Sequence, residues 1–210
     1  MIEEIFYFIQ LLISITVHEF SHSWAADSLG DPTPRLAGRL TLNPLPHIDF
    51  FLTILLPILL RISGSPVVFG AAKPVPFNPH FLKDKKWGPF LIALAGPFSN
   101  FILAIVFSFS LKMLVYFDGG FLNSSLMIIA LFLEVGVIVN VILGMFNLIP
   151  IPPLDGSKIL YVFLSSSGKI QLAELERVGF VLVVLFLLFA GETFWNAVEY
   201  VLNYLLPISF

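Results

Sequence analysis

Cysteine is absent from this 210-residue chain, and charged side chains are scarce, at 12% of the residues. Without cysteine there is no disulfide framework and no Cys-based zinc site, so a metal ion would have to be held by His, Asp or Glu. The net charge is −3 and no long basic run occurs, which excludes nucleic acid as an expected partner. The charged fraction is about half that of an average soluble domain.

Apolar residues dominate instead: they make up 58% of the chain, and the mean hydropathy is +0.95. A helix needs about 20 apolar residues to cross a bilayer. Long apolar segments lie at 2–26, 88–117, 124–149 and 178–190, and the last can continue to 206 as a second helix or a bent extension. The shorter run at 50–60 is typical of a re-entrant or interfacial segment. The sequence predicts an all-α, polytopic membrane helical bundle of about four to six membrane segments, with residues 1–210 forming one membrane-embedded domain.

The positions of Lys and Arg predict the orientation. Ten of the eleven fall within 27–87 and 156–177, and none falls within 118–123. Because cytoplasmic loops are enriched in Lys and Arg, the first long segment is expected to run from outside to inside. This orientation brings His18, His22 and Asp155 to the cytoplasmic side at one level of the membrane.

The sequence HEFSH at 18–22 has the H-E-x-x-H pattern. On a helix, positions i and i+4 share one face, so His18 and His22 can bind one metal ion. Glu19 is offset from them and can act on a water molecule as the general base of a zinc hydrolase. Ionisable groups inside an apolar span are costly, which argues against a chance match.

A catalytic zinc site also needs a third protein ligand and an open position. Asp155 is a candidate, because Pro150 ends the preceding helix and Pro152 and Pro153 are expected to keep the chain extended. The same residue fits equally well as the N-cap of a helix that starts at Gly156.

Other polar residues in apolar surroundings have two interpretations each. Asn147 offers an amide donor for developing negative charge or for an interhelical hydrogen bond, and Asn140 suits the interhelical role better. His47 and Asp49 form either a polar pair beside the site or, as we favour, a cluster that closes a loop. Glu134 either is neutral and hydrogen-bonded or lines a water path.

The segment AGPFSN at 95–100 is typical of a packing motif. Gly96 allows a neighbouring helix to approach closely, and Pro97 bends the helix. Asn100 can donate or accept a hydrogen bond across to the helices that carry the metal ligands.

Three motifs together resemble the site-2 proteases, the intramembrane zinc peptidases: HEFSH, AGPFSN, and N-x-x-P-x-P-x-x-D-G at 147–156. The segments RLTLNPLPHIDF at 39–50 and FGAAKPVPFNP at 69–79 look like the compact branch that lacks a PDZ domain. The resemblance implies His18, His22 and Asp155 as ligands of one Zn²⁺ per chain and Glu19 as general base. It also implies that Asn147 binds the substrate carbonyl or its oxyanion.

The resemblance implies an intramembrane zinc metalloprotease that hydrolyses peptide bonds of transmembrane protein or peptide substrates near the cytoplasmic side of the bilayer. A prokaryotic plasma membrane fits the compact branch. Residues 67–77 are expected to form a small β-like edge that pairs with the unwound substrate. The alternative is a metal-binding membrane transporter or sensor without hydrolase activity, which has no specific need for Glu19.

Overall fold

The computed structural model describes residues 2–49, 55, 62, 73–117 and 124–206. Within these residues the chain forms seven α-helices and a short 3₁₀ helix, and it contains no strand. The elements are α1 (Ile2–Ser28), α2 (Thr33–Leu36), η1 (Leu45–His47), α4 (Trp87–Phe117), α5 (Ser124–Asn147), α6 (Asp155–Tyr161), α7 (Ser166–Glu176) and α8 (Gly179–Leu205). The all-α prediction is confirmed.

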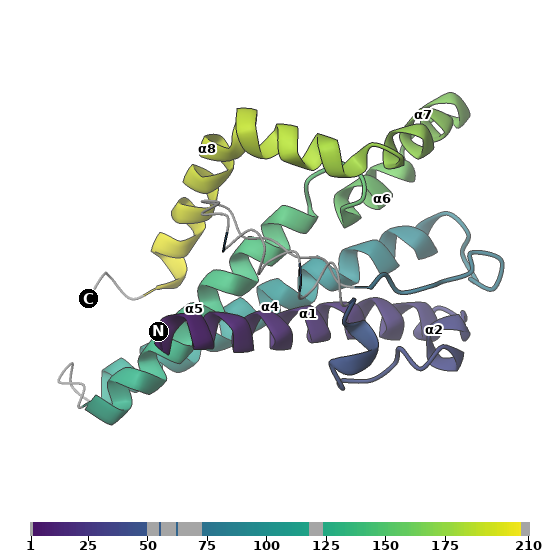
Figure 1. The fold of residues 1–210 in the computed structure, drawn as a ribbon. Coiled ribbons are helices and arrows are strands. Elements are labelled where there is room, and N and C mark those ends of the chain that lie inside the picture. Colours follow the sequence, from purple (N-terminus) through teal and green to yellow (C-terminus); the bar gives the residue numbers. More distant parts are fainter. Residues whose placement is uncertain (1, 50–54, 56–61, 63–72, 118–123, 207–210) are drawn as a thin grey trace.

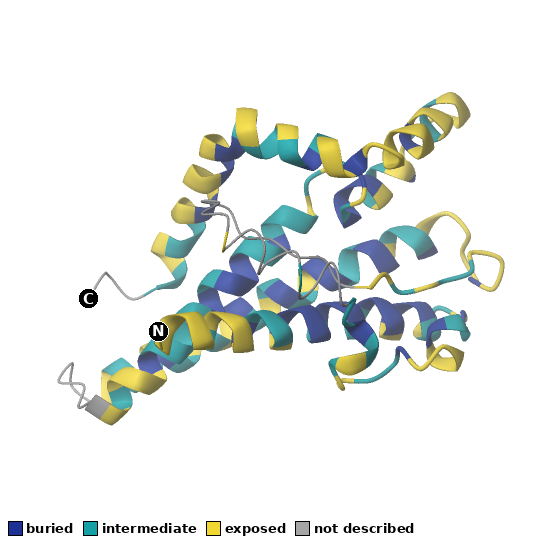
Figure 2. Cartoon of the chain, in the orientation of Figure 1, coloured by how far each residue is buried: buried dark blue, intermediate teal, exposed yellow. Residues whose placement is uncertain are grey.

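Three of these helices are long and apolar enough to cross a membrane: α4, residues 125–147 of α5, and α8. Their outward faces carry large apolar side chains, such as Phe109 and Phe189, which are 63% and 86% exposed. Figure 2 shows these exposed faces in yellow, most extensively on α8. Lipid tails solvate such a surface, whereas water does not. α1 has 27 residues and is more polar toward its C-terminal end, so length and composition alone do not select it.

Helices α1, α4 and α5 pack against one another and form the centre of the bundle (Figure 1). One apolar core joins α4, α5 and α8, with the buried residues Ala104, Val137, Val141, Phe194 and Val198. A second core joins the end of α1 to the start of α4, with the buried residues Ala25, Ala26, Leu82 and Ile92. The second core fixes the C-terminal half of α1, which contains the HEFSH motif, against α4.

Buried polar side chains hold the segment before α4 against the loop after α1. Asp31 is fully buried, and its carboxylate accepts the backbone N–H of Asn78 at 2.5 Å. Arg39 is 5% exposed and donates to the carbonyl oxygens of Lys73 and Pro74 at 3.2 and 3.4 Å. These bonds keep residues 73–77 beside the C-terminal end of α1.

The last apolar segment forms one continuous helix, α8, which changes direction along its length (Figure 1). The bent extension is therefore the correct alternative for residues 190–206. The re-entrant prediction for 50–60 lies outside the described residues apart from Leu55, and so does the 67–72 part of the β-like prediction. The remaining residues, 73–77, have no strand structure.

Candidate metal centre

The two histidines of HEFSH lie one turn apart in the buried half of α1. Each is 6% exposed, and their Nε2 atoms are 3.1 Å apart. Helical geometry alone places them on one face. Glu19, the next residue after His18, is 9% exposed and lines a cavity that both histidines also line.

Asp155 reaches these histidines from the start of α6. Residues 148–154 form a series of turns, so the prediction of an extended chain is wrong: the chain has to fold back from the end of α5 toward α1. Gly156 allows this, because a Cβ there would collide with the carbonyl oxygen of Leu148. Asp155 is the first residue of α6 and makes no capping bond, because its carboxylate points at the histidines; the N-cap interpretation is wrong.

The three side chains converge on one point. Asp155 Oδ2 lies 3.1 Å from His18 Nε2 and 3.0 Å from His22 Nε2, which completes a nearly equilateral triangle. Tetrahedral zinc with bonds of about 2.0–2.1 Å places its ligand atoms roughly 3.3 Å apart. These three residues could therefore bind one metal ion, as the sequence predicted.

The protonation of the two rings supports a cation at the centre of the triangle. His18 Nδ1 lies 2.6 Å from Asn100 Oδ1, and His22 Nδ1 lies 2.6 Å from the carbonyl oxygen of Ile92. Both partners are acceptors, so each Nδ1 carries a proton, and in the neutral form of each ring Nε2 is the nitrogen that can bind a metal. Two lone pairs and a carboxylate oxygen then face one another, which is the arrangement of a metal site.

α4 leaves room for the centre at Gly96. A Cβ at this position would lie 2.6 Å from His18 Nε2 and closer still to His22 Nε2. The prediction that Gly96 permits close helix packing is confirmed, and the groups that it accommodates are the rings of His18 and His22.

Lys158 contacts the oxygen of Asp155 that faces away from the histidines, with Nζ 2.9 Å from Oδ1. The ammonium group of Lys158 favours the ionised form of Asp155, because opposite charges in contact stabilise each other. Asp155 is therefore ionised, as a metal ligand must be.

A cavity of about 340 Å³ adjoins the triangle. Glu19, Asn147 and Lys158 line it, together with Pro74 and Phe77 of the segment before α4. It contains the proposed ligands, the proposed base and an amide donor, which are the groups needed for peptide hydrolysis.

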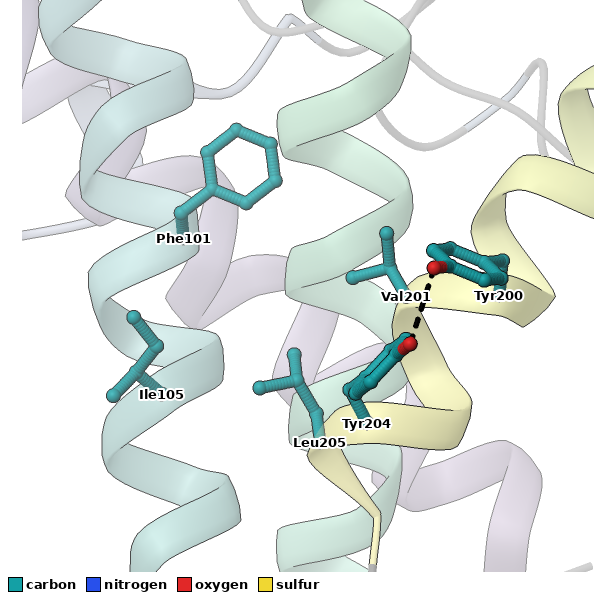
Figure 3. A pocket seen from close by; sticks show the side chains of 6 residues that line it. All are labelled: Phe101, Ile105, Tyr200, Val201, Tyr204 and Leu205. Atoms are coloured by element: carbon teal, nitrogen blue, oxygen red, sulfur yellow. Dashed lines mark hydrogen bonds between the residues drawn. The ribbon is translucent and has the colours of Figure 1, made fainter.

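A second cavity, of about 250 Å³, lies between α4 and the C-terminal part of α8. Figure 3 shows its lining, which consists of Phe101, Ile105, Tyr200, Val201, Tyr204 and Leu205. The hydroxyl groups of Tyr200 and Tyr204 bond each other at 3.1 Å. Among the described residues that line this cavity there is no His, Asp, Glu or Lys, so the chemistry belongs to the first cavity.

The structure also places the other polar residues that the sequence singled out. Asn100 reaches across from α4 to His18, as expected for AGPFSN, and Asn140 forms an interhelical bond to Asn100 at 2.9 Å. His47 bonds the carbonyl oxygen of Thr41 through Nε2 at 2.9 Å, a contact within its own loop, while its buried Nδ1 has no hydrogen-bond partner among the described residues. Glu134 is half-buried in α5 and is not among the residues that line the cavity.

Sequence reasoning missed two groups at the site. Lys158 follows Asp155 by three positions, a spacing that pairs side chains on a helix, so a signal was present. The Ile92 carbonyl that orients His22 belongs to the main chain of a distant helix, and no residue type marks it.

The fold and the site define a class: a helical membrane protein with a buried His/His/Asp group suited to zinc. The chain belongs to peptidase family M50, whose family model matches residues 6–124 and 122–190. It is therefore a zinc metalloendopeptidase and a multi-pass integral membrane protein.

Three relatives illustrate the likeness. "Putative zinc metalloprotease YwhC" of Bacillus subtilis is 36% identical over 85% of this chain and 78% of its own length. "Putative zinc metalloprotease Rip2" of Mycolicibacterium smegmatis is 30% identical over 88% and 67%. "Zinc metalloprotease MJ0392" of Methanocaldococcus jannaschii is 29% identical over 87% of this chain and 42% of its own length. No solved structure matches the chain.

Proposed function

We propose that residues 1–210 form one membrane-embedded protease domain that hydrolyses peptide bonds of transmembrane proteins near the cytoplasmic face of a prokaryotic plasma membrane. His18, His22 and Asp155 hold one zinc ion. The observation that carries the proposal is the triangle of two histidine Nε2 atoms and one carboxylate oxygen beside a cavity within the helix bundle.

The residues divide the chemistry between them. Zinc, when bound, supplies Lewis-acid activation of water and of the scissile carbonyl. Glu19 takes a proton from the attacking water and passes it to the leaving amine. Asn147 donates one amide N–H to the carbonyl oxygen of Leu143 at 3.0 Å, and its second N–H can be offered to the substrate oxygen.

The segment 73–77 lines the cavity through Pro74, Val75 and Phe77 and is anchored by Arg39. We include it in the proposal as the edge that pairs with an unwound substrate, because a helical substrate must become extended before its peptide bond can be attacked. Val75→Pro removes one amide N–H and changes no ligand. Turnover should fall while zinc content stays at the wild-type level; unchanged turnover would remove this segment from the proposal.

The function is tested with wild type and Glu19→Gln purified in detergent, by measuring bound zinc and cleavage of a model transmembrane substrate. Glu192→Gln, an exposed glutamate on α8, is the matched control. About one zinc per chain in all three proteins, with cleavage lost only in Glu19→Gln, is the expected result. Cleavage by Glu19→Gln at the wild-type rate would contradict the assigned base. Zinc binding without cleavage in any protein would favour the metal transporter or sensor.

The orientation has its own test, because the chain has no cysteine. Single variants Glu3→Cys and Lys85→Cys introduce one thiol each, at the start of α1 and before α4. A membrane-impermeant thiol reagent applied to intact cells should label Glu3→Cys and leave Lys85→Cys unlabelled. The reverse pattern would place the site on the outer side.

A further inference from the structure

A chain of buried amide groups leads from α5 through α4 to the ligand histidine of α1. Asn140 and Asn100 are both fully buried, in apolar helices. Asn100 Nδ2 donates to Asn140 Oδ1 at 2.9 Å, and Asn100 Oδ1 lies 2.6 Å from His18 Nδ1. An interhelical role alone would be met by the bond between the two asparagines. The additional bond to His18 connects them to a proposed metal ligand.

Backbone carbonyl groups fix the direction of every bond in this chain. Asn140 Nδ2 donates to the carbonyl oxygen of Gly136 at 2.9 Å, so its Oδ1 is turned toward Asn100. Asn100 Nδ2 also donates to the carbonyl oxygen of Ser14 at 3.3 Å. A carbonyl oxygen can only accept, so a 180° rotation of either amide would lose the hydrogen bond that its Nδ2 donates to the main chain. Asn100 is left with an acceptor facing His18, which forces the proton onto Nδ1.

We propose that Asn100 and Asn140 are positioning residues that fix the tautomer and the ring orientation of His18. Different groups then orient the two histidine rings. The main chain of α4 orients His22, and an amide relay across three helices orients His18. If Asn100 rotated, its NH₂ group would face Nδ1, and the proton would move to Nε2 and block metal binding. This inference rests on the proposed metal site.

The test uses three variants and one control. Asn100→Leu removes the acceptor with little change in volume. Asn140→Leu removes the acceptor that holds Asn100, and Asn140→Asp keeps it. Ser108→Ala is the control, because it deletes another buried interhelical bond of α4, to the carbonyl of Leu205. Zinc dissociation constants are measured by chelator competition, and thermal melting checks that each protein is folded.

Asn100→Leu should weaken zinc binding about 10- to 100-fold, the usual effect of losing the partner of a ligand histidine. Asn140→Leu should weaken it less, Asn140→Asp should recover most of the loss, and Ser108→Ala should leave it within twofold of wild type. Equal losses in both Asn140 variants, or unchanged binding in Asn100→Leu, would overturn the relay while the zinc site of the wild type still stands. Absence of zinc in the wild type would instead refute the proposed function.

A second measurement does not depend on any variant folding. The chain has four histidines, and ¹⁵N NMR of the metal-free wild type distinguishes the neutral tautomers of each ring. His18 should carry its proton on Nδ1. An unprotonated Nδ1 of His18 would overturn the relay whatever the zinc measurements give.

Discussion

Gly96→Ala adds one methyl group at the point where α4 faces the rings of His18 and His22. The new Cβ would lie 2.6 Å from His18 Nε2, whereas ordinary contacts begin at 3.4 Å. Either α4 must withdraw from α1, or the rings must turn away from Asp155. Both movements disturb the triangle, whose sides are only 3.0–3.1 Å long.

The size of the effect follows from this overlap. Metal–ligand distances tolerate changes of about 0.2 Å, much less than the shift that the methyl group requires. Inserting a methyl group into a filled core costs about 1–3 kcal/mol. If that cost falls on the metal-bound form, zinc affinity drops roughly 5- to 150-fold.

The assay is chelator competition for zinc in detergent, with peptide cleavage measured on the same samples. Gly191→Ala is the matched control: Gly191 also lies within a long helix, but a Cβ there meets no atom within 4 Å. Gly191→Ala should bind zinc as the wild type does. A Gly96→Ala protein with wild-type zinc affinity would refute the argument that these rings abut α4.

Three further changes test the surroundings of the site. Gly156→Ala places a Cβ against main-chain carbonyls, so zinc content and melting temperature should fall together; a folded variant with full zinc would contradict this. Asp31→Ala leaves buried donors without their acceptor and should cost about 1.5–3 kcal/mol, several degrees in melting temperature; an unchanged melting temperature would contradict it. Backbone N–H groups of Trp87 and Lys86 lower the pKa of Asp84, so its ionised form stabilises the start of α4. That stability is present above the usual Asp pKa and lost as the pH falls through the lowered value. The melting-temperature gap between wild type and Asp84→Ala should therefore shrink below about pH 4 and stay constant near neutrality; a gap independent of pH would contradict it.

The parts of the site that one helix determines could be predicted from the sequence. The spacing of His18 and His22 fixes their relative position in any α-helix, whatever packs against it. Gly96 and Asn100 lie four positions apart on one face of α4. Their spacing alone therefore predicts that both face the same neighbouring helix.

The parts that depend on distant segments could not be decided locally. Asp155 is 137 positions from His18, and its local sequence fits a helix cap as well as a ligand. Only the turns of 148–154, together with the space at Gly156, direct its carboxylate toward α1. The relay through Asn140 likewise depends on how α5 is rotated about its axis. Asn residues are common in packed membrane helices, so the residue type alone does not identify the hydrogen-bond partner.

The contact between Lys158 and Asp155 bears on which kind of zinc site this can be. A structural site is closed by four protein ligands, whereas a catalytic site has three and keeps one position open. A carboxylate that used both oxygens would fill that position. Lys158 occupies Oδ1, so Asp155 presents only Oδ2 to the histidines. His18, His22 and Asp155 line one cavity together with Glu19 and Asn147, so the open position of a three-ligand site could receive both water and a peptide carbonyl.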